Sequence, residues 1–214
     1  MIPLLHDFTD RTVLVFGGGS VGARKARRFA REARVLVVSP DFSGEFDGSE
    51  LVRAAPTPED IPSWFDRAEP ALVVAATDDG ELNAAIERAA RERGVLANRA
   101  DTHGSREPGS VVVPATVRED PVVVAISTGA NSPALSRELR RRIEPELEGA
   151  GEMALVAGEL REALSELPAE QRRELLRSTV ASSAVWKDLR SGDTKRSQVV
   201  ADVLDRVNDG GNGP

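Results

Sequence analysis

A glycine-rich turn between an apolar segment and a helical one lies near the start of the chain. Residues 12–16 (TVLVF) are apolar throughout, which is typical of a strand buried on both faces. Gly17-x-Gly19-x-x-Gly22 follows at once, and the pattern from Ser20 to about Glu32 predicts a helix. In this order the first glycine permits a tight turn, the second admits a pyrophosphate, and the third packs helix on strand. The chain is therefore expected to begin with a nucleotide-binding βαβ unit.

Apolar and helical segments continue to alternate through the first half of the chain. We expect further strands at 35–39, 51–54, 71–77 and 95–98, with helices from about 58 to 65 and from 81 to 93. Strands alternating with helices at this spacing predict an α/β fold whose core is a doubly wound parallel sheet of the Rossmann type.

The pattern changes after Ala100, and four regions are expected from it. Two valine-rich segments, 110–118 and 121–127, have no helix between them and are expected to pair as an antiparallel hairpin. Ser132-Pro133 is a suitable start for a helix reaching about Glu148. We therefore predict a nucleotide-binding domain at 1–110, a small hairpin-and-helix dimerisation region at 111–150, a C-terminal helical domain at 151–208 and a disordered tail at 209–214.

Composition excludes several classes of function. The formal charge is −7, whereas modules that bind nucleic acid usually present a basic face. There is no cysteine, which excludes disulfides, thiolate catalysis and zinc–thiolate or iron–sulfur sites, and two histidines are too few for a metal cage built by the protein. No apolar run approaches the ~20 residues that span a bilayer, and the N-terminus lacks the features of a signal peptide. We expect a cytoplasmic protein without a metal site, nucleic-acid partner or membrane partner.

The expected cofactor contacts lie on the glycine turn and at the carboxyl ends of the strands. They are Gly17, Gly19, Ser20, Val21, Gly22, Ser39, Pro40, Asp41, Thr77 and Asp78. Asp41 is the acid expected to bind the ribose hydroxyls, although an ordinary turn residue is an equal alternative. No arginine follows it immediately to hold a 2′-phosphate, so NAD is favoured over NADP. Asp78 has the alternative role of starting the next helix.

Five segments occur together in an order that identifies a family resemblance. They are GGGSVGARK (17–25), AATDD (75–79) followed by Leu82 and Asn83, NRAD (98–101), Pro114-Ala115 and AISTGANSP (125–133). Over residues 2–148 the chain resembles the precorrin-2 dehydrogenase family of siroheme synthesis, including the N-terminal module of bifunctional siroheme synthase. The methyltransferase module of the fused enzyme has no counterpart here, so the resemblance implies a stand-alone enzyme.

The resemblance also implies a reaction and a set of site residues. Precorrin-2 would lose a hydride to NAD⁺ and protons to a base or to solvent, giving sirohydrochlorin. Asp101 matches the proposed catalytic aspartate of the family, with loop capping as its alternative role. Candidate contacts to the anionic substrate are Arg99, His103, Arg118, Thr128, Ser132 and Arg137. Some members of the family also insert Fe²⁺ into the product and others do not, and this sequence is compatible with both.

Two further interpretations concern assembly and an alternative function. The segments 110–118 and 121–127 carry more valine than one exposed hairpin tolerates, which favours a symmetric homodimer, as the resemblance also implies. The alternative is that the C-terminal helices cover the hairpin within one chain. A regulatory nucleotide-binding module of the kind that controls potassium transport also pairs a glycine turn with a segment like Ala76–Asn83. Such a module needs neither a catalytic base nor the valine-rich hairpin, which disfavours it.

Overall fold

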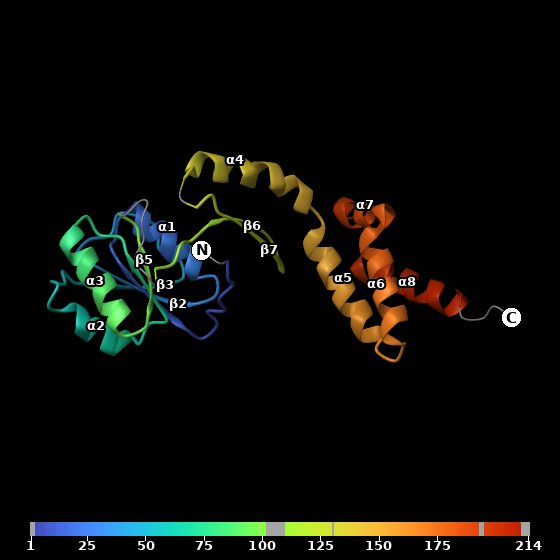
Figure 1. Ribbon diagram of the computed structural model, residues 1–214, viewed down its shortest axis with the longest axis horizontal. Helices are drawn as coiled ribbons and strands as arrows, with labels where there is room; N and C mark the ends of the chain where they lie inside the picture. Colours follow the sequence, from blue (N-terminus) through green and yellow to red (C-terminus); the bar gives the residue numbers. More distant parts are fainter. Residues whose placement is uncertain (1–2, 102–109, 130, 193–194, 211–214) are drawn as a thin grey trace. The chain divides into compact units, whose positions relative to one another are not determined.

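The chain folds into two compact units, Met1–Val113 and Pro114–Pro214, which are considered separately. The computed structural model describes residues 3–101, 110–129, 131–192 and 195–210 (Figure 1). None of the helices in these described ranges is both long and apolar enough to cross a membrane.

The first unit is built around a five-stranded parallel sheet in the order β3-β2-β1-β4-β5. The strands are β1 (Thr12–Phe16), β2 (Arg34–Ser39), β3 (Ser49–Arg53), β4 (Leu72–Ala75) and β5 (Leu96–Arg99). In β1, Val13 pairs with Val35 on one side and with Leu72 on the other. The order of strands therefore reverses between β1 and β4, and in open α/β sheets ligands bind outside the carboxyl ends of the strands at such a point.

Helices cover both faces of this sheet, which explains why the central strands β1 and β4 are almost entirely apolar and buried. Helix α1 (Ser20–Phe29) shares one core with Val13 and Val15, to which it contributes Ala23 and Ala26. Helices α2 (Ile61–Ala68) and α3 (Gly80–Glu92) share the other core with Leu14 and Phe16. Successive side chains of a strand point to opposite faces, so both cores draw on the same short strand. The doubly wound fold expected from the sequence is confirmed (Figure 1).

The expected hairpin forms, but its first strand is shorter than predicted. Strands β6 (Ala115–Glu119) and β7 (Val122–Ile126) pair antiparallel, with Val117 opposite Val124. The preceding residues belong to the first unit, because Ser110 bridges Ala97 of β5 and the amide of Val111 donates to the carbonyl of Ala97 at 2.7 Å. Pro114 separates the two segments, since proline has no N–H to contribute to a ladder. The prediction of one continuous strand over 110–118 is wrong.

The second unit continues with helices that pack around a separate core. Helix α4 (Pro133–Ile143) is followed by a 3₁₀ turn, Glu144–Leu147, so the helix ends before the predicted Glu148. Pro145 accounts for this, because it lacks the N–H that would continue the helix. The remaining helices are α5 (Ala150–Ala163), α6 (Ala169–Ala181), α7 (Ser183–Ser191) and α8 (Arg196–Gly210). Their core includes Val156 and Leu160, and α8 extends two residues past the boundary expected at 208.

Candidate functional site

The glycine turn after β1 is formed by close contacts that leave no room for side chains. Gly17 has a φ of +119°, and a Cβ atom added there would lie 2.2 Å from the carbonyl oxygen of Ala76. A Cβ on Gly22 would lie 2.0 Å from the carbonyl oxygen of Gly17. The turn is therefore pressed against the end of β4, and α1 is pressed against the turn. This close packing explains the need for glycine at the first and third positions of the motif.

A cavity of about 450 Å³ opens beside this turn at the carboxyl edge of the sheet. Its walls come from the ends of β1 and β2, the segments that follow β1, β2, β3 and β4, and the first turn of α3: Phe16, Gly17, Gly18, Gly19, Val38, Ser39, Pro40, Asp41, Ser43, Ala55, Pro56, Ala76, Thr77, Asp78, Asp79 and Leu82. A Cβ on Gly19 would meet no atom within 4 Å, so the turn faces open space there. Gly19 caps α1 without a side-chain hydrogen bond, and the first turn of α1 contains no acidic residue. A helix N-terminus of this kind fits the pyrophosphate of a dinucleotide.

The structure brings together most of the cofactor residues expected from the sequence. Seven of them line the cavity: Gly17, Gly19, Ser39, Pro40, Asp41, Thr77 and Asp78. The other three, Ser20, Val21 and Gly22, form the first turn of α1, immediately after the lining residue Gly19. Sequence reasoning missed Gly18, the middle glycine of the motif, which also lines the cavity. A Cβ there would lie 1.9 Å from the carbonyl oxygen of Asp41.

The acid expected to bind ribose has an arginine neighbour that sequence reasoning did not identify. Ser39 of β2 lies opposite Arg53 of β3 in the parallel register. One guanidinium nitrogen of Arg53 is 3.3 Å from the carbonyl oxygen of Pro40 and 3.4 Å from the carboxylate of Asp41. The guanidinium also lies 5.6 Å from the centre of the Phe42 ring. Both charged side chains are largely exposed, so the pair contributes little to stability but places a cation beside the cavity.

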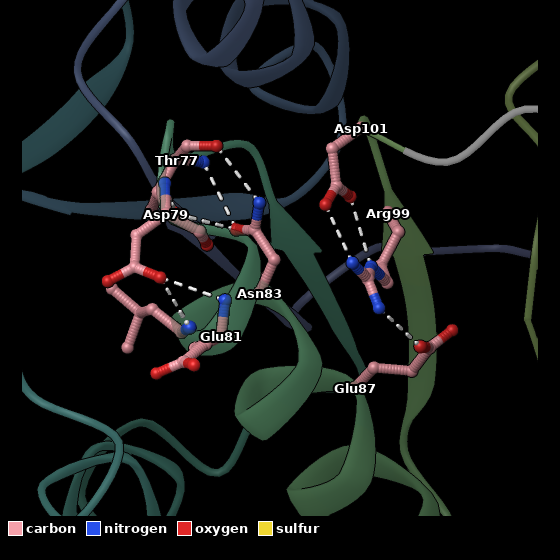
Figure 2. A network of polar contacts seen from close by, with 8 residues as sticks. Thr77, Asp79, Glu81, Asn83, Glu87, Arg99 and Asp101 are labelled. Carbon is pink, nitrogen blue, oxygen red and sulfur yellow. Dashed lines mark hydrogen bonds and ion pairs between the residues drawn. The ribbon is translucent and has the colours of Figure 1, made fainter.

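A polar network fixes the end of β4 against the start of α3 (Figure 2). The buried amide of Asn83 accepts hydrogen bonds from the hydroxyl of Thr77 at 2.7 Å and from its backbone N–H at 3.2 Å. The same amide donates to the carbonyl oxygen of Thr77 at 2.9 Å. Asp79 caps α3 by accepting from the N–H groups of Glu81 and Leu82 at 2.8 and 3.0 Å. The sequence shows Asn83 in the AATDDGELN segment, but its role depends on the helix turning it back toward Thr77.

The candidate base, Asp101, is joined to an arginine on the same face of the chain (Figure 2). Arg99 donates from Nε at 3.0 Å and from Nη2 at 2.6 Å to the two carboxylate oxygens of Asp101. Its Nη1 donates to the carboxylate of Glu87 on α3 at 3.1 Å. The hydrogen bond from Arg99 holds the pKa of Asp101 below its usual value, with a smaller contribution from Asn83. Hydrogen bonds to Asp101 and, to a smaller extent, to Glu87 raise the pKa of Arg99.

Asn98, the residue before Arg99 on β5, contacts both α1 and the chain that follows the sheet. The ammonium group of Lys25 donates to the side-chain oxygen of Asn98 at 2.5 Å, and the Asn98 amide donates to the carbonyl oxygen of Val111 at 2.7 Å. Asn98 is buried, so its amide satisfies both neighbours away from water. Val111 is therefore held against β5 by Asn98 and by Ala97.

The other candidate substrate residues that the structure describes all lie in the second unit. Arg118 lies on β6 and pairs with Asp120 at 3.8 Å, while Arg137 lies exposed on α4. The hydroxyl of Thr128 is 3.0 Å from both the Ser132 carbonyl oxygen and the Ser136 hydroxyl, and Ser132 caps α4 by accepting from the N–H of Leu135. His103 lies outside the described residues. Among the described residues, no group of three or more His, Asp or Glu side chains is arranged to hold a metal ion.

Known proteins are similar to this chain in sequence and in fold. Residues 4–115 match a family model described as "Putative NAD(P)-binding". A curated precorrin-2 dehydrogenase from Methanosarcina barkeri is 36% identical over 200 residues, which cover 86% of this chain and 85% of that one. A siroheme synthase from Pseudomonas paraeruginosa is 35% identical over 90% of this chain, which spans only 39% of that protein's length. A solved structure of SirC, a precorrin-2 dehydrogenase, superposes with a TM-score of 0.66 at 22% identity, covering 90% of this chain and 98% of that one.

The network at the start of α3 predicts a large loss of stability when Asn83 is truncated. Asn83→Ala leaves the partly buried N–H of Thr77 without this partner and opens a cavity at a buried position, so the free energy of unfolding of the first unit should fall by about 2–4 kcal/mol. Asp78→Ala, at an exposed position in the same turn, should change stability by no more than about 0.5 kcal/mol. Native-state hydrogen exchange of the β1 amides measures both. Equal opening free energies in the two variants would contradict this role for Asn83.

Proposed function

The chain belongs to the precorrin-2 dehydrogenase family, and from that premise we propose that it oxidises precorrin-2 to sirohydrochlorin with NAD⁺ as hydride acceptor. The observation that carries the proposal is the cavity at the switch point of the sheet, formed by the glycine turn and the ends of β2 and β4. Asp101 follows the adjacent strand, β5, at the same edge of the sheet. A hydride acceptor and a proton acceptor at one edge are what this oxidation requires.

The proposed chemistry divides between the cofactor and the residues of the chain. Bound NAD⁺ supplies the hydride acceptor. The turn Gly17–Gly22 and the N-terminus of α1 hold the pyrophosphate, and Ser39–Asp41 hold the adenosine ribose. The Asp101 carboxylate takes up the proton that leaves precorrin-2 as the hydride departs, and it then releases this proton to solvent.

The substrate class explains the other candidate residues in this proposal. Precorrin-2 carries eight carboxylates, and Arg118 and Arg137 supply cations that pair with such groups. The hydroxyls of Thr128 and Ser132 supply further contacts. Iron insertion into the product would take most of its ligands from the macrocycle, and repeating the assay with Fe²⁺ distinguishes members with that activity from those without it. We place the reaction in the cytoplasm. The named relatives do not favour a regulatory nucleotide-binding module.

We further propose that two copies of the chain associate through the second unit. The hairpin is a two-stranded sheet, and such a ribbon is marginally stable when isolated in water. Helix α4, which packs near the hairpin, contributes no buried residue, and Leu135 on this helix is 49% exposed. Val111 packs in the first unit, so the support for a dimer comes from β6, β7 and α4 rather than from the full valine-rich segment.

The proposed cofactor site predicts a defect in binding without a defect in folding. Gly19→Asp adds its side chain in open space but places a negative charge against the pyrophosphate, so NAD⁺ affinity should fall at least about tenfold. Gly19→Ala adds the same Cβ without the charge and should retain more of the affinity. Titration calorimetry with NAD⁺ measures both, and circular dichroism checks the fold. Wild-type affinity in a folded Gly19→Asp protein would move the cofactor away from this turn.

The proposed base predicts a defect in turnover alone. Asp101→Asn keeps the shape of the side chain but removes its ability to accept a proton, so oxidation of precorrin-2 should slow by about 10²-fold or more while NAD⁺ affinity is unchanged. Asp66→Asn, which alters an exposed carboxylate on α2, is the matched control and should turn over like wild type. Turnover of Asp101→Asn within a few-fold of wild type would assign Asp101 to loop structure instead.

The proposed dimer predicts the mass in solution. Light scattering at micromolar concentration should give about twice the chain mass of 22.9 kDa. A mass near that of one chain would show that the hairpin and α4 need no second copy.

A further inference from the structure

Each of the three guanidinium nitrogens of Arg99 donates a hydrogen bond to a carboxylate of its own unit. Two nitrogens of the guanidinium contact Asp101 and a third contacts Glu87. The side chains of Arg99 and Glu87 are only 15% and 17% exposed, and that of Asp101 is 30% exposed. An arginine held in this way is poorly placed to bind the carboxylates of a substrate, which was its expected role.

We propose that Arg99, anchored by Glu87, is a positioning residue for Asp101 that fixes the orientation of its carboxylate for proton abstraction. This inference rests on the proposed function, because it takes Asp101 as the base. Glu87 and Arg99 touch Asp101 or each other rather than the cofactor cavity, whose walls do not include them. Their effect on the reaction is therefore exerted through Asp101.

The geometry of the three side chains supports this role. Asp101 lies two residues after Arg99, in the bend that follows β5, and two hydrogen bonds join the two side chains. The planar fork of arginine engages both oxygens of a carboxylate at once, which prevents the carboxylate from rotating. Glu87 comes from α3, on a different element, and fixes the guanidinium from its other end (Figure 2). We call Arg99 and Glu87 the clamp. A base held by this clamp keeps one orientation before the substrate binds, and a fixed orientation of the reacting group contributes to rate.

The clamp also determines the pH range in which Asp101 is ready to act. Among the residues that the structure describes, the groups that face Asp101 come from two elements: Arg99 on β5, and from α3 the neutral Asn83 together with Glu87, which acts through Arg99. The positive charge of Arg99 favours the ionised form of Asp101, so its pKa lies below the usual value. A general base must be ionised to accept a proton. Removing Arg99 should therefore shift the acidic limb of the pH profile of kcat/KM to higher pH.

Four variants of the full-length protein test the inference with precorrin-2 and NAD⁺ as substrates. Arg99→Gln should lower kcat by about tenfold with KM within about twofold of wild type, and should raise the pH of the acidic limb. Arg99→Lys keeps the positive charge but loses the two-pronged hydrogen bonding of the guanidinium. The pH of the acidic limb should therefore return toward the wild-type value while kcat stays low. Glu87→Gln should lower kcat less and should not raise the limb. Arg88→Gln, an exposed arginine on the same helix, should match wild type throughout.

The outcomes separate this inference from the proposed function. Loss of turnover in Asp101→Asn together with an unmoved acidic limb in Arg99→Gln would overturn the inference and leave the proposed base in place. A rise in KM with unchanged kcat in Arg99→Gln would likewise overturn it, by making Arg99 a substrate ligand. Full turnover in Asp101→Asn would contradict the role of Asp101 as the base and therefore also the positioning role of Arg99. The ¹³C chemical shift of the Asp101 carboxyl can be titrated without substrate. The midpoint of this titration should move to higher pH in Arg99→Gln but not in Glu87→Gln.

Discussion

The close approach of the Gly17 turn to the end of β4 is the contact on which the cofactor cavity depends. The Cα of Gly17 lies so near the carbonyl group of Ala76 that no side chain fits between them. Because β1 and β4 are neighbours at the reversal of strand order, this contact brings the turn and Thr77 to the same edge of the sheet. The N-terminus of α1 then faces open space at Gly19 rather than another element. The arrangement leaves a concave site without any charged side chain from α1 in its wall.

Two kinds of polar network stabilise neighbouring strand ends in different ways. At the end of β4, Asn83 satisfies the polar groups of Thr77 with neutral hydrogen bonds, which hold the backbone of the turn in place. After β5, the contacts are ionic, and Arg99 bridges Asp101 and Glu87. Ion pairs within a partly shielded site are stronger than those in open solvent and also change proton affinity. The first network fixes the backbone of the turn, and the second both fixes side chains and changes their proton affinity.

The sheet was predictable because its central strands β1, β2 and β4 are buried on both faces, and the short apolar runs at 12–16, 35–39 and 71–77 show this directly. The glycine motif located most of the cavity for the same local reason. Two element boundaries failed at proline: Pro114 separates Val111 from the hairpin, and Pro145 ends α4 early. In both segments the proline lacks the backbone N–H that the predicted strand or helix would use.

The partners of the site residues could not be predicted, because they are set by contacts between distant segments. Arg53 reaches Asp41 only through the register of β2 with β3, and Glu87 reaches Arg99 only because α3 packs beside β5. Neither contact leaves a periodic signal in the chain. Arg99 illustrates the consequence: its charge alone suggested a substrate ligand, whereas its three hydrogen bonds assign it to Asp101 and Glu87.

The central claim is that this chain transfers a hydride from precorrin-2 to NAD⁺. Anaerobic incubation of the purified protein with enzymatically made precorrin-2 and NAD⁺, followed by visible and near-ultraviolet absorption, tests it most directly. Sirohydrochlorin and NADH should appear together in equal amounts, and neither should appear when NAD⁺ is omitted. Binding of NAD⁺ with no oxidation of precorrin-2 would contradict it.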